Sequence, residues 1–223
     1  MYKKAFADRN FLPTVTSVEY GEALNKRLKI NKHYALIHDV FYDSYKSAFE
    51  IKKCTEQTVF CGGRNGRDWD EMIQVAKKMP DVNFNFVMPE KKYKQFTGNF
   101  TANINVLSEI PKTEFDDLMR QSCLVCLPLD TDAPAGLIVL FQAAAYRKLV
   151  ITSSTQTTRE YINEQRGVLL EKNVQDYINA INYYLNNPKI AQEKADNLFA
   201  FLEKYCSEEE FIKGIVSLIH TIQ

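Results

Sequence analysis

Two stretches of this 223-residue chain combine glycine with features that suit an anion. The first, VFCGGRNGRDWDEM (59–72), carries three glycines and two arginines, namely Gly62, Gly63, Gly66, Arg64 and Arg67. Glycine lets the backbone turn sharply or approach a ligand closely, and guanidinium groups bind phosphate oxygens in pairs. The glycine spacing differs from the dinucleotide pattern GxGxxG, and the arginines interrupt it. The stretch therefore predicts a phosphate-binding loop.

A plainer interpretation of the two arginines remains open from the sequence. Arg64 and Arg67 could be solvated loop residues that pair with Asp68 or Asp70, because exposed ion pairs of this kind form readily and contribute little.

The second stretch, PLDTDAPAGLIVLFQAAAYRKLVIT (128–152), reads as a strand end, an acidic loop, a helix and a further strand. Ala135 and Gly136 place almost no side chain where the helix begins. A helix start carries free N–H groups and a partial positive charge, so Gly136 predicts a second anion-binding point. The alternative is that Gly136 merely relieves a tight turn.

Three polar residues of this second stretch could contact a sugar or a ribose. Asp130 and Asp132 are poor phosphate ligands, but their carboxylates accept hydrogen bonds from sugar hydroxyls. Gln142 follows in the second turn of the helix, where its amide could reach a ribose hydroxyl; otherwise it is a polar residue on an exposed stripe.

The surrounding elements are expected to bring both stretches to one edge of a sheet. Short, nearly unbroken apolar runs predict six strands, at 58–62, 83–88, 103–107, 123–128, 149–153 and 167–171. Amphipathic stretches alternate with them, and polar residues predict four helix starts, at Asp68, Thr113, Asn173 and Ser207. This alternation predicts an α/β fold with a doubly wound, mostly parallel six-stranded, Rossmann-like sheet. Open parallel sheets bind ligands at the carboxyl ends of their strands, where both loops would lie.

The two ends of the chain do not follow this alternation. Residues 1–50 offer a strand-like piece, a helix and a second strand-like piece, which is too little for a domain of its own. We expect them to be the remnant of a preceding domain plus a crossover, with 51–223 as the Rossmann-like domain. Residues 189–223 form its helical tail. The remnant predicts an exposed apolar face that includes Phe6, Phe11, Phe41, Tyr42 and Tyr45.

Together the two stretches resemble the C-terminal half of a GT-B glycosyltransferase of the retaining group that includes glycogen synthase and sucrose synthase. The resemblance covers roughly residues 55–220 and implies a domain that binds a nucleotide-sugar donor. It implies that Arg64 and Arg67 hold the diphosphate, with Gly63 in the same loop. It also implies that the amides of Gly136 and Leu137, at the start of the helix, receive phosphate or sugar.

The chain departs from the family pattern at three points. One of the family's paired glutamates, which contacts the ribose, aligns with Gln142. The other falls near Ala133, which leaves Asp132 as the nearby carboxylate for the sugar. The third departure is length, because the acceptor-binding domain of the family is missing here apart from residues 1–50. No catalytic residue can be assigned, and a structural or solvated role is favoured for His38.

Composition restricts the partners. Basic and acidic residues balance at 28 each, so no overall charge attracts nucleic acid or an anionic membrane. No apolar run approaches the ~20 residues of a membrane span, and the start of the chain has no signal-peptide pattern.

The five cysteines include Cys123 and Cys126 within an apolar strand, which predicts core thiols rather than a redox or metal site and fits a reducing cytoplasm.

The sequence thus favours the donor-binding half of a nucleotide-sugar-dependent glycosyltransferase in glycan or surface-polysaccharide assembly, inactive in transfer by itself. It would use no cofactor or metal beyond its nucleotide-diphosphate sugar. Its expected partner is the missing N-terminal half, in cis or in trans, or a second copy. We expect a cytoplasmic location, with the inner membrane face as a further place of action. The alternative is a non-catalytic, degenerate GT-B module that binds a nucleotide sugar or a protein. A sugar-nucleotide epimerase is a third hypothesis, but its catalytic carboxylates and histidines are not visible.

Overall fold

A computed structural model of the chain describes residues 8, 11–46, 54, 56–131 and 133–222, and the structural statements that follow concern these residues. Asp132 and Phe6, both named above, lie outside them.

Six strands form one sheet in the order β5-β4-β3-β6-β7-β8, and every neighbouring pair is parallel. The strands are β3 (Thr58–Gly62), β4 (Asn83–Val87), β5 (Ile104–Leu107), β6 (Leu124–Leu127), β7 (Leu149–Ser153) and β8 (Val168–Leu170). The predicted doubly wound fold is confirmed, and each strand starts and ends within one residue of its predicted position. The strand order reverses between β3 and β6, which lie side by side at the middle of the sheet. In such sheets a ligand binds at this point.

Helices connect the strands and cover both faces of the sheet. They are α4 (Trp69–Lys77), α5 (Glu90–Phe96), α6 (Lys112–Gln121), α7 (Leu137–Ala145), α8 (Thr158–Tyr161) and α9 (Val174–Asn186). In one core cluster, residues of α4 and α9 pack against one face of the sheet. In the other, residues of α6, α7 and α8 pack against the opposite face. Every residue of the central strands β3, β6 and β7 except Thr58 is buried, because helices cover both faces of the sheet. This explains why the sequences of these strands are almost unbroken apolar runs.

Three of the four predicted helix starts are found. Asp68 and Asn173 cap α4 and α9 with their side chains, and the Ser207 hydroxyl accepts a hydrogen bond from the N–H of Glu210. The prediction at Thr113 is wrong. That helix begins at Lys112 after Pro111, whose fixed φ of −58° already suits a helix entry.

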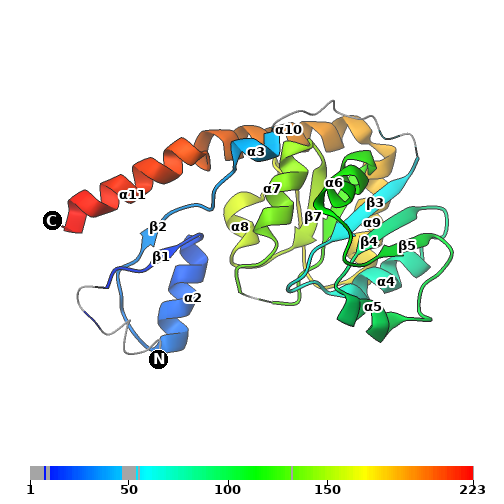
Figure 1. Cartoon of the computed structure of the whole chain (residues 1–223), viewed down its shortest axis with the longest axis horizontal. Coiled ribbons are helices and arrows are strands. Elements are labelled where there is room, and N and C mark those ends of the chain that lie inside the picture. The colour runs from blue at the N-terminus through cyan, green and yellow to red at the C-terminus, as the bar shows by residue number, and fades with distance from the viewer. Residues whose placement is uncertain (1–7, 9–10, 47–53, 55, 132, 223) are drawn as a thin grey trace.

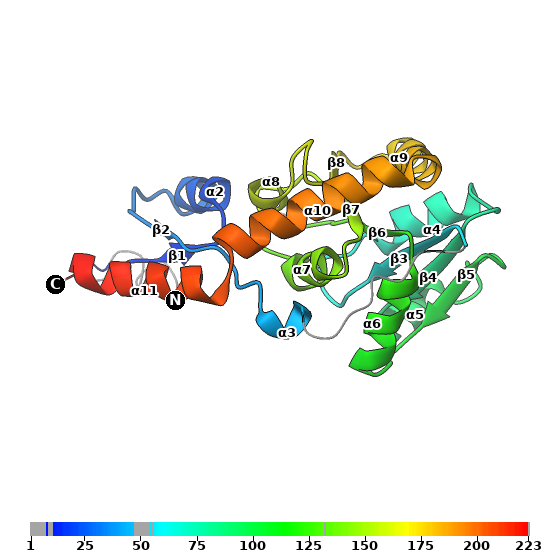
Figure 2. The same ribbon diagram turned by 90° about the horizontal axis from the view of Figure 1, so that it is seen from above.

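The C-terminal tail consists of α10 (Pro188–Tyr205) and α11 (Glu208–Ile222). Figure 2 shows α10 running beside α7 and α9, while α11 continues beyond the sheet. The first part of the chain forms β1 (Thr14–Val15), α2 (Val18–Leu28), β2 (Ala35–Leu36) and α3 (Asp43–Lys46), with β1 and β2 in a separate parallel pair. In Figure 1, β1, β2 and α2 lie between the sheet and the outer end of α11, whereas α3 lies near α7 and α10.

The predicted exposed aromatic face is only partly present. Phe11 and Tyr42 are exposed and Tyr45 is half-buried. Phe41 is fully buried, so its predicted exposure is wrong. The reason is the return of α10, because the Phe41 ring packs edge-on against Phe141 of α7 and Phe199 of α10.

The prediction that Cys123 is a free core thiol is also wrong. Cys123 directly precedes β6 and is only partly buried. It forms a disulfide with Cys54, which lies 69 residues earlier in the chain. Cys61, Cys126 and Cys206 are free and buried, as expected for small apolar side chains. None of the helices in the described part of the chain combines the length and the apolar character needed to cross a bilayer.

Candidate functional site

The loop after β3 and the loop after β6 are joined at the middle of the sheet edge. The N–H of Asp68 donates to the carbonyl of Pro128 at 3.0 Å, and the N–H of Asp130 donates to the carbonyl of Gly66 at 3.1 Å. Arg67 and Leu129 accordingly form an isolated antiparallel bridge. The two stretches singled out in the sequence therefore form one continuous piece of structure.

Arg67 lies at the centre of this junction. Only 4% of the residue is exposed, and its guanidinium donates from Nε to the Gly62 carbonyl at 2.9 Å and from Nη1 to the Asn65 carbonyl at 3.1 Å. A Cβ atom at Gly63 would lie 2.6 Å from its Nη2, and one at Gly136 would lie 3.4 Å from its Nη1. The structure thus brings Gly63, Arg67 and Gly136 together around one cationic group.

Burial lowers the pKa of Arg67, and this effect outweighs the opposing influence of Cys61 and Asp130. A guanidinium keeps its charge through such a change. The junction therefore holds a fixed positive charge with few of its donors turned to solvent.

Arg64 has a different environment from Arg67. Its side chain is 76% exposed, and Nη2 donates to Oε2 of Glu109, which follows β5, at 2.7 Å. The proposed pairing of the two arginines with Asp68 or Asp70 is therefore not what forms. Arg64 pairs with a residue of another loop, and Arg67 binds backbone carbonyls.

Gly136 has φ +85° and ψ −13° at the N-cap position of α7. Side-chain-bearing residues rarely adopt this left-handed conformation, so the tight turn requires glycine. The requirement does not exclude an anion role, because Leu137 begins a nine-residue helix whose first amides have no intrahelical acceptor. Both readings of Gly136 are compatible with its geometry.

Gln142 is only 5% exposed, so the alternative of a polar residue on an exposed stripe does not hold. It lies on α7 among buried neighbours that include Phe141 and Ala143. Asp132 is outside the described residues, whereas Asp130 lines the pocket described next.

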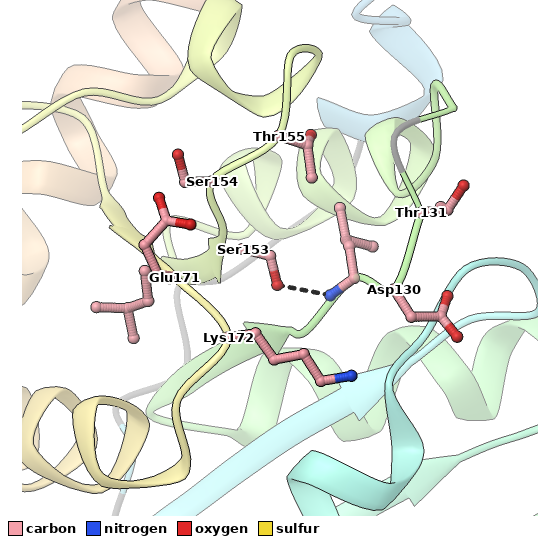
Figure 3. Close-up of a pocket in the computed structure, with 9 residues that line it drawn as sticks. Asp130, Thr131, Ser153, Ser154, Thr155, Glu171 and Lys172 are labelled. Carbon is pink, nitrogen blue, oxygen red and sulfur yellow. Dashed lines mark hydrogen bonds between the residues drawn. The ribbon is translucent and has the colours of Figure 1, made fainter.

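A pocket of about 250 Å³ opens at the carboxyl ends of β6, β7 and β8. Figure 3 shows its polar lining, which comes from three loops and consists of Asp130, Thr131, Ser153, Ser154, Thr155, Glu171 and Lys172. The residues after β7 and β8 were not among the predicted site residues. The predicted strand ends could have indicated them, since these strands share the edge with β3 and β6.

An ion pair ties this pocket to the arginine loop. Lys172 pairs with Asp68, the N-cap residue of α4 that directly follows Arg67. Glu71, one turn into α4, is only 3% exposed, and burial together with the neighbouring Asp68 raises its pKa against the opposing effect of Lys172. The ammonium of Lys172 thus offsets the charge of a buried acidic pair at the start of α4.

A second, smaller pocket of about 80 Å³ lies on the other side of the arginine loop, at the ends of β4 and β5. It is lined by apolar residues and by two charged ones, namely Gly63, Arg64, Val87, Met88, Pro89, Glu109, Ile110 and Phe115. The junction around Arg67 therefore has a pocket lined mainly by polar residues on one side and a pocket of mixed lining on the other.

His38 is half-buried away from these loops in the fold. Its Nε2 lies 3.0 Å from Oε1 of Glu160, and its ring packs edge-on against Tyr161 and Phe201. These contacts connect the first part of the chain to α8 and α10. Among the described residues, no group of three or more His, Cys, Asp or Glu side chains is placed to hold a metal ion.

Residues 57–198 match the family profile described as glycosyl transferases group 1. The match covers more than half of the chain, and the chain belongs to this family. No curated protein matches its sequence as a relative.

The fold is that of GT-B glycosyltransferases. HepE of Anabaena, crystallised with UDP-glucose, has a TM-score of 0.80 and 15% identity over 94% of this chain and 64% of its own. Sucrose-phosphate synthase from Thermosynechococcus elongatus has a TM-score of 0.82 and 16% identity over 99% of this chain and 60% of its own. A glycosyltransferase from Rickettsia africae has a TM-score of 0.78 and 13% identity over 99% and 66%. The present chain thus spans about two thirds or less of the length of these proteins.

Proposed function

We propose that the chain is the donor-binding part of a nucleotide-sugar-dependent glycosyltransferase in glycan or surface-polysaccharide assembly. The observation that carries this proposal is the convergence of Gly63, Arg67 and Gly136 at the switch point of the sheet. The diphosphate would lie over these glycines, where the α7 amides and the arginine charges face it. HepE, which has the same fold, was crystallised with UDP-glucose, which supports a nucleotide-sugar ligand.

Arg64 is the side chain available to contact the diphosphate directly. It is largely exposed, and its single ion pair with Glu109 can exchange for a phosphate oxygen, because exposed ion pairs are weak. Arg67 would act mainly by fixing the loop and by contributing a buried positive charge. The sugar would lie towards the polar pocket, where the carboxylate of Asp130 can accept from its hydroxyls.

Transfer to an acceptor requires a second wall. Holding two reactants in near-attack geometry contributes ~7–11 kcal/mol to catalysis, and the donor-binding residues named here supply one side. We propose that the other side comes from an N-terminal half that meets the apolar face of α11. This face exposes Phe211, Ile212, Ile215, Val216 and Ile219.

The competing proposal is a non-catalytic GT-B module that binds a nucleotide sugar or a protein. The burial of Gln142 favours it, because the side chain that the resemblance suggests for ribose binding is only 5% exposed. Ala133 likewise offers no carboxylate for the sugar.

Nucleoside diphosphate release from a panel of donors, with simple acceptors, separates the two proposals. We expect slow, acceptor-independent release by the chain alone and acceptor-dependent release after an N-terminal half is added. Binding without any release in either condition would favour the module. Turnover near the ~10 per second of typical enzymes by the chain alone would contradict the need for a second half.

A further inference from the structure

Glu109 occupies an unusual position in the loop after β5. Its φ of +51° is in the left-handed region, which a residue with a Cβ adopts only when the surrounding structure imposes it. Its side chain is 48% exposed and lines the smaller pocket, with Oε2 on Arg64. The backbone therefore holds a carboxylate beside the apolar residues of this pocket.

The pocket beside Glu109 is suited to a flat ring that packs on apolar side chains and donates hydrogen bonds to a carboxylate. Val87, Met88, Ile110 and Phe115 contribute apolar walls, and Glu109 is the only carboxylate among the described residues that line the pocket. Two backbone hydrogen bonds fix its floor, from the Gly63 N–H to the Val87 carbonyl and from the Met88 N–H to the Leu107 carbonyl, both at 3.1 Å. Since the proposed diphosphate position adjoins Gly63, a nucleobase would reach this pocket.

We propose that Glu109 is a specificity-determining residue that selects guanine as the base of the donor. The inference rests on the proposed function. Guanine presents two adjacent donors, N1–H and the N2 amino group, which match the two oxygens of a carboxylate. Uracil presents one N–H between two carbonyl oxygens, and a carboxylate repels both of those oxygens. One acceptor-only side chain therefore favours guanine and disfavours uracil.

Arg64 takes part in the same exchange. In the unliganded protein the Arg64 guanidinium donates to the Glu109 carboxylate. When guanine binds that carboxylate instead, the guanidinium is free to contact the diphosphate. Uracil does not take the place of Arg64 on the carboxylate, so only a guanine nucleotide frees the guanidinium. The ratio of GDP to UDP affinity therefore reports on the base contact together with the release of Arg64 that it causes.

Calorimetry with GDP, IDP and UDP tests the inference in the wild type, in Glu109→Gln and in the control Glu114→Gln. Glu114 is exposed on α6 and does not line the pocket, so the control makes the same charge change elsewhere. We expect the wild type and the control to bind GDP about tenfold more tightly than UDP, as a bidentate base contact provides. IDP, which lacks the N2 amino group, should bind more weakly than GDP. In Glu109→Gln the ratio of GDP to UDP affinity should fall to about two or less, because the glutamine amide offers one acceptor.

The other outcomes contradict the inference in distinguishable ways. Equal affinities for GDP and UDP in the wild type, or a ratio that Glu109→Gln leaves unchanged, would overturn it while the proposed function stands. Tighter binding of both nucleotides by Glu109→Gln at a constant ratio would show that the residue only competes for Arg64. Failure of the wild type to bind any of the three would overturn the inference and the proposed function together.

Discussion

Arg64 and Arg67 are three residues apart in the chain, yet the structure gives them different tasks. Arg67 is enclosed and binds two backbone carbonyls, whereas Arg64 projects into solvent and pairs with Glu109. The difference arises because Leu129 and Gly136 come from a distant stretch and pack around Arg67. Residue type and spacing predicted a cationic loop. That Arg67 is buried and Arg64 exposed follows from the contact with the second stretch, which the sequence of the loop does not encode.

This division predicts different consequences for the two alanine variants. Arg64→Ala should weaken nucleoside diphosphate binding about tenfold with little change in the free energy of unfolding, because it removes an exposed charge. Arg67→Ala should weaken binding at least as much and also lower the free energy of unfolding by about 2–4 kcal/mol, because buried carbonyls lose a charged donor. Calorimetry and urea denaturation measure the two quantities. Equal stability of both variants would refute the structural role of Arg67.

Lys148 allows a prediction on pH at the same scale. The residue is buried just before β7, and burial lowers its pKa to about 8 from an ordinary 10.5. Between these values the unfolded chain binds the proton that the folded chain has released, so folding stability rises with pH across this window. The size of the rise is about 3 kcal/mol.

Urea denaturation of the wild type and of Lys148→Met at pH 7.5 and pH 10 measures this rise. The wild type should gain stability between the two pH values relative to the variant, because methionine carries no titrating group. A parallel pH dependence of the two proteins would show that Lys148 is not responsible.

At the scale of elements, the site depends on the close approach of the loops after β3 and β6. Gly66 has φ +64°, and a Cβ atom there would lie 2.5 Å from Cγ2 of Thr131 and 3.2 Å from Cβ of Ala135. The absence of a side chain at Gly66 therefore lets the acidic loop lie directly on the arginine loop.

Gly66→Ala should lower the free energy of unfolding by about 1–3 kcal/mol and weaken nucleotide binding, since both the clash and the left-handed backbone oppose it. The double variant Gly66→Ala, Thr131→Ser removes the clashing methyl group and separates the two causes. It should recover only part of the loss, because the backbone strain remains. Full recovery would show that the positive φ contributes little.

Much of the element scale could be predicted from the sequence. The six strands, their parallel direction and the caps at Asp68 and Asn173 were predicted from sequence patterns, and the structure confirms them. Pro111 was missed as the residue before a helix because the nearby Thr113 offered a more familiar cap. The burial of Gln142 could not be predicted, because α7 is buried on nearly all sides and its sequence has no polar stripe that would show its orientation.

At the scale of the whole molecule, the errors share one physical cause. Phe41 is buried by α10, and Cys123 meets Cys54 across 69 residues of sequence. Both contacts join the first part of the chain to distant segments, and no local pattern encodes them. The polar pocket differs in this respect, because its lining comes from three strand ends that were each predicted from the sequence.

The apolar face of α11 leads to a prediction at this scale. The helix packs through Gly214 against Ile37, next to β2, and its other side exposes Ile212 and Val216. If this side meets the N-terminal half, Ile212→Glu with Val216→Glu should abolish association in trans and leave the thermal stability of the sheet domain unchanged. Analytical ultracentrifugation of the mixed halves measures association. Unaltered association of the double variant would assign the contact to another surface.

The central claim is that the junction of the arginine loop with the start of α7 binds the diphosphate of a nucleotide. Calorimetry of the wild-type chain with GDP and UDP, compared with guanosine and uridine, tests it most directly. Because charge-assisted contacts to phosphate stabilise by ~1.5–3 kcal/mol each, at least one diphosphate should bind, about tenfold or more tighter than its nucleoside. Failure to bind either diphosphate, or equal affinity for a diphosphate and its nucleoside, would contradict the account.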